Sequence, residues 1–144
     1  MLNQRPMEKP IPKNVLLVDD HQTFLTTLAQ QLRDYSDSFC ILTAENGDRA
    51  LKVLESAHVD LVVTDLKMPV MDGFELISHT KKKYPGIPVI VLSSFLCPEL
   101  ETRLRAMGVS QCIEKASLDI RVMEEMIVES WQGVSVEEKG GEVF

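Results

Sequence analysis

Cysteine, aromatic residues and long apolar runs are scarce in this chain of 144 residues. Its cysteines are odd in number and form no CxxC pair, which predicts reduced thiols and a cytoplasmic protein. Cys40 and Cys112 fall in apolar strand candidates, so we expect both to be small core residues. No stretch has the length and apolar character of a signal-peptide core or a membrane span, so membrane insertion is not expected.

Positive charge is also limited. Lysine and arginine number 15 against 22 acidic residues, which gives a net charge of −7 and argues against a nucleic-acid partner. The basic cluster Lys81–Lys83 falls near the end of an expected helix, where cations suit the helix dipole. Hydrophobic residues make up 44% of the chain, which at this length is enough for one domain with a core.

Short apolar runs alternate with helical patterns from residue 13 to residue 131. Such runs predict strands buried on both faces, as in a parallel sheet, and the alternation predicts the right-handed βαβ units of an α/β fold. We expect strands at 13–19, 39–44, 60–65, 87–93 and 111–114, and helices at 23–35, 48–57, 72–84, 98–107 and 118–131. Residues 1–12 are expected to form a flexible lead-in, 13–131 the domain, and 132–144 a flexible tail or linker stub.

Polar residues stand directly after the apolar runs of four of these strands: Asp19 and Asp20, Asp65, Ser93 and Lys115. Ligands bind outside the carboxyl ends of the strands in open α/β sheets, so we expect these side chains to meet at one edge. Clustered carboxylates repel one another unless a cation is present, and oxygen ligands suit Mg²⁺ shared with a phosphate. An aspartate can also take a phosphoryl group, which a hydroxyl and an ammonium would help to neutralise.

The segment from Asp65 to Gly73, which reads DLKMPVMDG, sharpens this prediction. Pro69 predicts a tight loop just after the strand. Asp72 is a suitable N-cap for the third helix, and Gly73 follows where a side chain would crowd the turn.

Taken together, these motifs resemble the receiver domain of two-component response regulators. The resemblance spans about residues 14–131 and depends on Val18-Asp19-Asp20, Asp65-x-x-Met-Pro-x-Met-Asp-Gly, Pro88-Val-Ile-Val-Leu-Ser93 and Lys115, in this order. It implies a flavodoxin-like fold of three α/β/α layers, with a five-stranded parallel sheet in the order 2-1-3-4-5.

The resemblance also implies roles for individual residues. Asp65 would be the phosphoacceptor, and Mg²⁺, with Mn²⁺ as the alternative, would bind Asp19, Asp20, Asp65 and the backbone carbonyl of Lys67. Ser93 and Lys115 would be the switch and phosphate-binding groups, with Ser94, Phe95 and Cys112 as further contacts of the switch region.

The implied donor is a sensor histidine kinase or a histidine phosphotransfer protein. The output partner, a domain or protein, would bind the face of the fourth helix, fifth strand and fifth helix, and a homodimer is an alternative. Such a protein catalyses only its own phosphorylation and dephosphorylation.

The chain departs from the family pattern at two positions. Ala116 follows Lys115 where the family usually has proline, and Cys112 stands where the fifth strand commonly carries an aromatic residue. A cysteine cannot report a switch by rotation of a ring, so coupling to the output face could be weaker or differently built. Phosphate on Asp65 is expected to recruit Ser93 and Lys115 and to shift residues 94–97, which biases a pre-existing two-state equilibrium. In that loop Phe95 could contact a partner or pack inward.

Three other functions compete with this interpretation. A receiver-like binding module that signals without phosphorylation is favoured by Cys112 and opposed by the intact acids. A magnesium phosphohydrolase would need a second acid close after Asp65, and residues 66–68 supply none. A flavin carrier is disfavoured because the loop 20–23 is acidic and lacks glycine. The histidines are expected on the surface, with none placed as a phosphodonor; they are His21, His58 and His79.

Overall fold

The computed structural model describes residues 12–143, and the side chains of residues 12–132. The expected lead-in therefore lies outside the described residues, apart from Pro12. Among the described helices, none combines the length and the apolar character that crossing a bilayer requires. The elements are β1 (Lys13–Val18), α1 (Gln22–Tyr35), β2 (Phe39–Ala44), α2 (Gly47–Ser56), β3 (Leu61–Thr64), α3 (Gly73–Lys83), β4 (Val89–Ser93), α4 (Pro98–Ala106), β5 (Gln111–Glu114) and α5 (Ile120–Val143), with a 3₁₀ turn at Lys115–Ser117.

The strands form one parallel sheet in the order β2-β1-β3-β4-β5, which confirms the predicted fold class. The register places the carboxyl ends side by side: Val18 pairs with Ala44 and with Thr64. Hydrogen bonds continue one residue past the strands, from Asp19 N to Ala44 O at 3.1 Å and from Asp65 N to Val18 O at 3.0 Å. The ladder therefore carries both aspartates to the same edge of the sheet.

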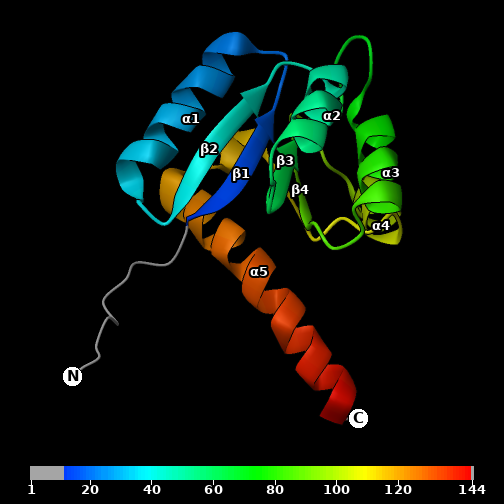
Figure 1. The fold of residues 1–144 in the computed structure, drawn as a ribbon. Helices are drawn as coiled ribbons and strands as arrows, with labels where there is room; N and C mark the ends of the chain where they lie inside the picture. Colours follow the sequence, from blue (N-terminus) through cyan, green and yellow to red (C-terminus); the bar gives the residue numbers. More distant parts are fainter. Residues whose placement is uncertain (1–11, 144) are drawn as a thin grey trace, which may run out of the picture.

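Helices cover both faces of the sheet, with α1 and α5 on one face and α2, α3 and α4 on the other (Figure 1). Alternate residues of β1 divide between the two cores: Val15 and Leu17 pack toward α1 and α5, and Leu16 and Val18 toward the other helices. All four are buried, as are all residues of β3 and β4, which confirms the prediction of burial on both sides for these three strands, whereas every residue of β5 is only half-buried. Burying each such side chain stabilises the fold by about 1.5–3 kcal/mol.

Local contacts fix where α3 begins. The Asp72 side chain accepts a hydrogen bond from Glu75 N at 2.9 Å, so the expected N-cap is confirmed. At Gly73, a Cβ atom would lie 2.1 Å from the backbone oxygen of Asp65. Only a residue without a side chain lets the helix begin this close to the end of β3. The helix and the strand end that carries Asp65 are thereby held together.

The expected end of the last helix at Trp131 is wrong, because α5 continues to Val143. Apolar periodicity is a signal of packing, and a nucleated helix can extend without it, since each added residue gains a hydrogen bond. Trp131 lies within the helix and is a packing residue: its Nε1 donates to Asp60 O at 2.9 Å, and its ring meets Phe39 edge-on. The assignment of residues 132–144 as a linker stub stays a prediction.

The prediction that Cys40 is a core residue is also wrong. It lies on the edge strand β2, where Phe39 and Ile41 are buried and Cys40 between them is exposed. Side chains alternate between the faces of a strand, and one face of this part of β2 is open to solvent. An apolar run alone does not distinguish an edge strand of this kind from a central one.

Candidate functional site

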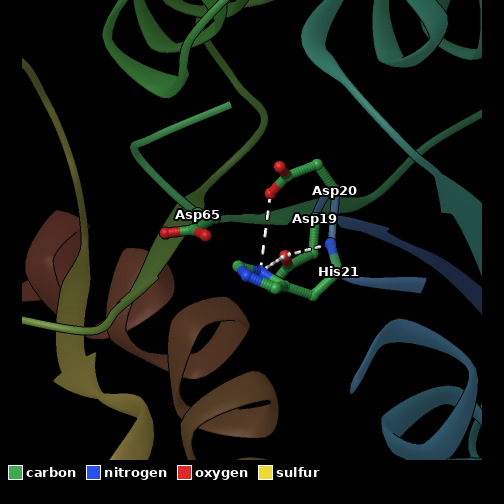
Figure 2. Close-up of side chains that lie close together, drawn as sticks. All are labelled: Asp19, Asp20, His21 and Asp65. Atoms are coloured by element: carbon green, nitrogen blue, oxygen red, sulfur yellow. Dashed lines mark hydrogen bonds and ion pairs between the residues drawn. The ribbon is translucent and has the colours of Figure 1, made fainter. Parts of the chain in front are cut away.

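Three acids meet where β1 and β3 end (Figure 2). Asp19 and Asp65 are 3% and 4% exposed, and Asp20 is half-buried. With His21, each of these residues offers one potential ligand atom, and the four atoms lie within 4.8 Å of one another. The parallel register of β1 and β3 produces this cluster, because Val18 and Thr64 are paired and the acids follow them directly.

Lys115 joins the cluster from the turn that follows β5. Its Nζ lies 2.7 Å from Asp19 Oδ2 and 3.0 Å from Asp65 Oδ2. Burial by itself would lower the pKa of the ammonium, but hydrogen bonds and charge from the two aspartates outweigh burial and raise the pKa above its ordinary value. Nζ also lies 4.6 Å from the centre of the Phe24 ring on α1, a cation–π contact. The ammonium is therefore held charged between both carboxylates.

Asp65 is oriented by its own backbone neighbours as well as by Lys115. Its Oδ1 accepts a hydrogen bond from Leu66 N at 2.7 Å, and Thr64 Oγ1 donates to the Asp65 carbonyl oxygen at 2.8 Å. One carboxylate oxygen thus faces a backbone amide and the other faces the ammonium. The carboxylate cannot rotate without losing one of these bonds.

The donor set fits a divalent cation. Within the described residues, Asp20 Oδ1 is buried and has no hydrogen-bond partner, which is costly for a carboxylate oxygen unless a cation satisfies it. Carboxylate oxygens are the ligands that Mg²⁺ prefers. Lys67, whose carbonyl is the expected fourth ligand, lies in the β3–α3 loop with an exposed side chain. The metal-binding roles of all four residues stay predictions.

The β3–α3 loop contains an unusual turn. Met71 N donates to Pro69 O at 2.8 Å, and Val70 between them has φ = 71° and is 83% exposed. This φ is in the left-handed region that β-branched residues avoid, so the turn is strained. Met71 packs so tightly on the start of α2 that a Cβ atom on Gly47 would lie 2.7 Å from Met71 Cγ. The loop is therefore pinned to α2 as well as to α3.

The structure does not bring the Ser93 hydroxyl into the acidic cluster. Ser93 is buried, and its Oγ donates to Phe95 O at 3.0 Å and accepts from Phe95 N at 3.3 Å. Phe95 itself is 64% exposed and Ser94 is exposed, so of the two alternatives for Phe95 the structure shows the outward one. Leu96 N donates to Glu114 Oε2 at 2.9 Å, which ties this loop to the end of β5.

Cys112 is half-buried on β5 and packs at the edge of the core under α2, α3 and α4. Burial raises the pKa of its thiol, the Arg105 guanidinium opposes this shift, and Glu101 adds to it. The thiol therefore stays protonated at neutral pH and behaves as a small apolar group. Among the described residues every peptide bond is trans, including the one between Lys115 and Ala116.

Sequence reasoning missed the contacts of three residues of the site. His21 is exposed, as expected, but its Nδ1 lies 3.1 Å from Asp19 Oδ1 and 3.5 Å from Asp20 Oδ1. Glu114 ties down the β4–α4 loop, and Phe24 covers Lys115. His21 adjoins the acid pair in sequence, which was an available signal. The contacts of Glu114 and Phe24 join segments far apart in the chain and leave no local pattern.

Comparisons with known proteins agree with this geometry. A family profile described as the response regulator receiver domain matches residues 15–127. The chain is 43% identical over 83 residues to the transcriptional regulatory protein GlrR of Escherichia coli (strain K12), a match that covers 58% of this chain and 18% of GlrR. It spans between 11% and 46% of the lengths of the first curated relatives it matches.

Solved structures show the same arrangement of elements. A receiver domain protein (CheY-like) from Methanospirillum hungatei JF-1 has a TM-score of 0.79 and 25% identity, covering 88% of this chain and 99% of its own. The response regulator TrrA of Thermotoga maritima, in complex with Mg²⁺ and BeF, has a TM-score of 0.71 and 28% identity, covering 82% of this chain and 98% of its own.

Proposed function

This chain belongs to the response regulator receiver domain family, and from that premise we propose that Asp65 accepts a phosphoryl group from a phosphohistidine. The donor is a sensor histidine kinase or a histidine phosphotransfer protein in the cytoplasm. One observation carries the proposal: the Lys115 ammonium bridges Asp19 and Asp65 at 2.7 and 3.0 Å, beside an Asp20 Oδ1 that is buried and accepts no hydrogen bond. This arrangement combines an oriented carboxylate with one positive charge. The buried Asp20 oxygen would be satisfied by a second positive charge, that of a cation.

The nucleophile is the ionised Asp65 carboxylate. One of its oxygens attacks phosphorus, the bond from phosphorus to the donor's imidazole nitrogen breaks, and the imidazole leaves with the bonding electrons and takes a proton from solvent. Leu66 N and Lys115 Nζ hold the carboxylate in one orientation before the donor arrives. Attack of water on the same phosphorus later releases inorganic phosphate and restores Asp65. The chain thus catalyses only its own phosphorylation and dephosphorylation.

Asp19, Asp20, Asp65 and the Lys67 carbonyl would hold Mg²⁺, with Mn²⁺ as the alternative. A bound ion supplies positive charge against the oxygens of the transferred group. Lys115 supplies a second positive charge, and its raised pKa keeps that charge in place throughout the physiological pH range. Lys115 can move one hydrogen bond from Asp65 Oδ2 to an oxygen of the phosphoryl group.

Phosphorylation would then act on the β4–α4 loop. The new phosphoryl oxygens attract the Ser93 hydroxyl, which must give up its two hydrogen bonds to Phe95. Residues 94–97 shift as a result, and the hydrogen bond from Leu96 N to Glu114 is strained or lost. This biases a two-state equilibrium of the α4–β5–α5 face, where an output domain or protein, or a second copy of the chain, would bind.

Intact-mass measurement after incubation with Mg²⁺ and acetyl phosphate tests the proposal. We expect one phosphoryl adduct on the wild-type chain and none on Asp65→Ala. Asp48→Ala is the matched control, since this exposed aspartate pairs only with Lys52 on its own helix, and it should keep the adduct. No adduct on the wild type favours a receiver-like module that signals without phosphorylation. Continuous turnover of unrelated phosphoesters favours a phosphohydrolase.

A further inference from the structure

We propose that His21 is a nitrogen ligand of the acidic cluster and gives the site a preference for late first-row divalent ions such as Ni²⁺ and Co²⁺ over Mg²⁺. The inference rests on the proposed function, because it concerns the ion bound beside Asp65. It adds a donor that the carboxylates cannot replace: imidazole nitrogen is a good ligand for Ni²⁺ and Co²⁺, whereas Mg²⁺ strongly prefers oxygen.

The distances around His21 match those between ligands of one ion. Neighbouring ligands of an octahedral ion with bonds of about 2.1 Å lie about 3.0 Å apart. His21 Nδ1 is 3.1 Å from Asp19 Oδ1 and 3.5 Å from Asp20 Oδ1 (Figure 2). Asp65 supplies a further oxygen, and all four donor atoms lie within 4.8 Å of one another. Small side-chain movements would therefore bring all four onto one ion.

A second observation points to a cation at this place. In the described part of the chain, Asp20 Oδ1 is shielded from solvent and accepts no hydrogen bond, although the neighbouring ring nitrogen is only 3.5 Å away. A shielded carboxylate oxygen without a hydrogen bond is costly, and an ion between Asp20 and His21 would satisfy it. Asp20 and His21 thus offer an oxygen and a nitrogen that lie 3.5 Å apart to one ion.

The histidine ring is also held ready for this role. His21 N donates to Asp19 Oδ1 at 2.9 Å, which keeps the residue folded back over the carboxylate. The side chain is 66% exposed. When Nδ1 binds an ion, the ring proton is on Nε2. Because the ring is exposed, Nε2–H can donate a hydrogen bond to water. A purely structural role for His21, as a hydrogen-bond donor to Asp19, would not affect discrimination between ions.

Calorimetric titration of the full, untagged chain with NiCl₂ and separately with MgCl₂ tests the inference. We expect His21→Asn to weaken Ni²⁺ binding at least tenfold while Mg²⁺ binding changes less than twofold. His58→Asn is the matched control, because His58 is exposed and lies 2.9 Å from a carboxylate, Asp60, outside the cluster. It should leave both affinities unchanged. With Co²⁺, the visible d–d absorption of the wild-type complex should shift in His21→Asn.

The outcomes separate this inference from the proposed function. If His21→Asn weakens both ions equally, or neither, the nitrogen-ligand assignment is wrong while the receiver function stands. If the wild type binds neither Mg²⁺ nor Ni²⁺, the metal site itself fails, and the proposed function fails with it. Thermal unfolding of His21→Asn without metal checks that the variant is folded; an unchanged melting temperature ties any loss of Ni²⁺ affinity to the missing nitrogen.

Discussion

The acidic pocket and the β4–α4 switch region lie at the same edge of the sheet but are built differently. The pocket follows β1 and β3, whose paired ends are fully buried, and two of its aspartates, Asp19 and Asp65, are held by bonds of 2.7–3.0 Å. The switch region consists of residues 93–97 and β5, and every residue of β5 is only half-buried. Its loop is held by Ser93 and by one side chain from β5, Glu114.

The difference fits what the proposed function requires of each region. A phosphoacceptor must be positioned before its donor arrives, so rigid strands and backbone bonds suit it. A segment that changes conformation must be drawn from the less stable part of the structure, with few buried contacts to lose. The comparison predicts that substitutions in the pocket reduce global stability, whereas substitutions in the switch region alter local opening.

The largest expected effect is at the contact between α3 and the strand end that carries Asp65. Gly73→Ala would place a Cβ atom 2.1 Å from a backbone oxygen that cannot move aside without distorting the pocket. We expect a loss of about 3 kcal/mol or more in the free energy of unfolding, measured with urea. Gly86→Ala is the control, because its Cβ atom would meet nothing within 4 Å. A loss below 1 kcal/mol in Gly73→Ala would show that the pocket is not rigid.

The next largest effect is expected at Lys115. Lys115→Met leaves Asp19 and Asp65 facing each other without a cation, and we expect a loss of about 1–3 kcal/mol, less than for a fully buried pair because the pocket edge meets water. The folded pKa of Lys115 is raised above its ordinary value of 10.5, so its charge contributes full stability below pH 10.5 and loses it as the pH rises through the folded pKa.

The pH dependence provides the check on Lys115. Urea midpoints of the wild type and Lys115→Met should differ by a constant amount between pH 7 and pH 10 and converge only above about pH 10.5. Lys52→Met is the control, because Lys52 forms a helix-surface pair with Asp48 and should show a difference near zero throughout. A gap that closes already below pH 9 would contradict the raised pKa.

In the switch region a smaller and local effect is expected. Glu114→Ala removes the acceptor for Leu96 N, and global stability should fall by only about 1 kcal/mol. Hydrogen exchange of the Leu96 amide should accelerate at least fivefold, while exchange at Asp65 stays unchanged. Glu114→Gln keeps an oxygen acceptor at the same reach and should restore most of the protection. Equal acceleration at Leu96 and Asp65 would mean that the two regions open together.

The sequence predicted the pocket better than the switch region for a physical reason. Apolar runs indicate strands that are buried on both faces, and the polar residues directly after them mark where the strands end. The structure therefore brings together, as expected, Asp19, Asp65 and Lys115. Ser93 was placed at the correct strand end, but its hydroxyl faces Phe95. The bond between Glu114 and Leu96 joins two segments without a pattern, and the position of Cys40 on an edge strand depends on topology.

The smallest expected effect concerns the one strained residue on the pocket side. Val70 has φ = 71°, which costs a residue with a side chain about 1–2 kcal/mol, and most of all a β-branched one. Val70→Gly removes that cost but adds about 0.4–1 kcal/mol of unfolded-chain entropy, so we expect a net gain of about 0.5 kcal/mol in the urea-derived free energy of unfolding.

Val70→Ala is the informative comparison for this strain. Alanine keeps the Cβ atom and so keeps much of the penalty of a positive φ, and its stability should lie between those of the wild type and Val70→Gly. Because Val70 is 83% exposed, neither change removes buried contacts, and backbone strain remains as the cause of any difference. If Val70→Gly destabilises the chain, the valine side chain stabilises the turn between Pro69 and Met71 instead of straining it. The loop beside the pocket would then contain no stored strain.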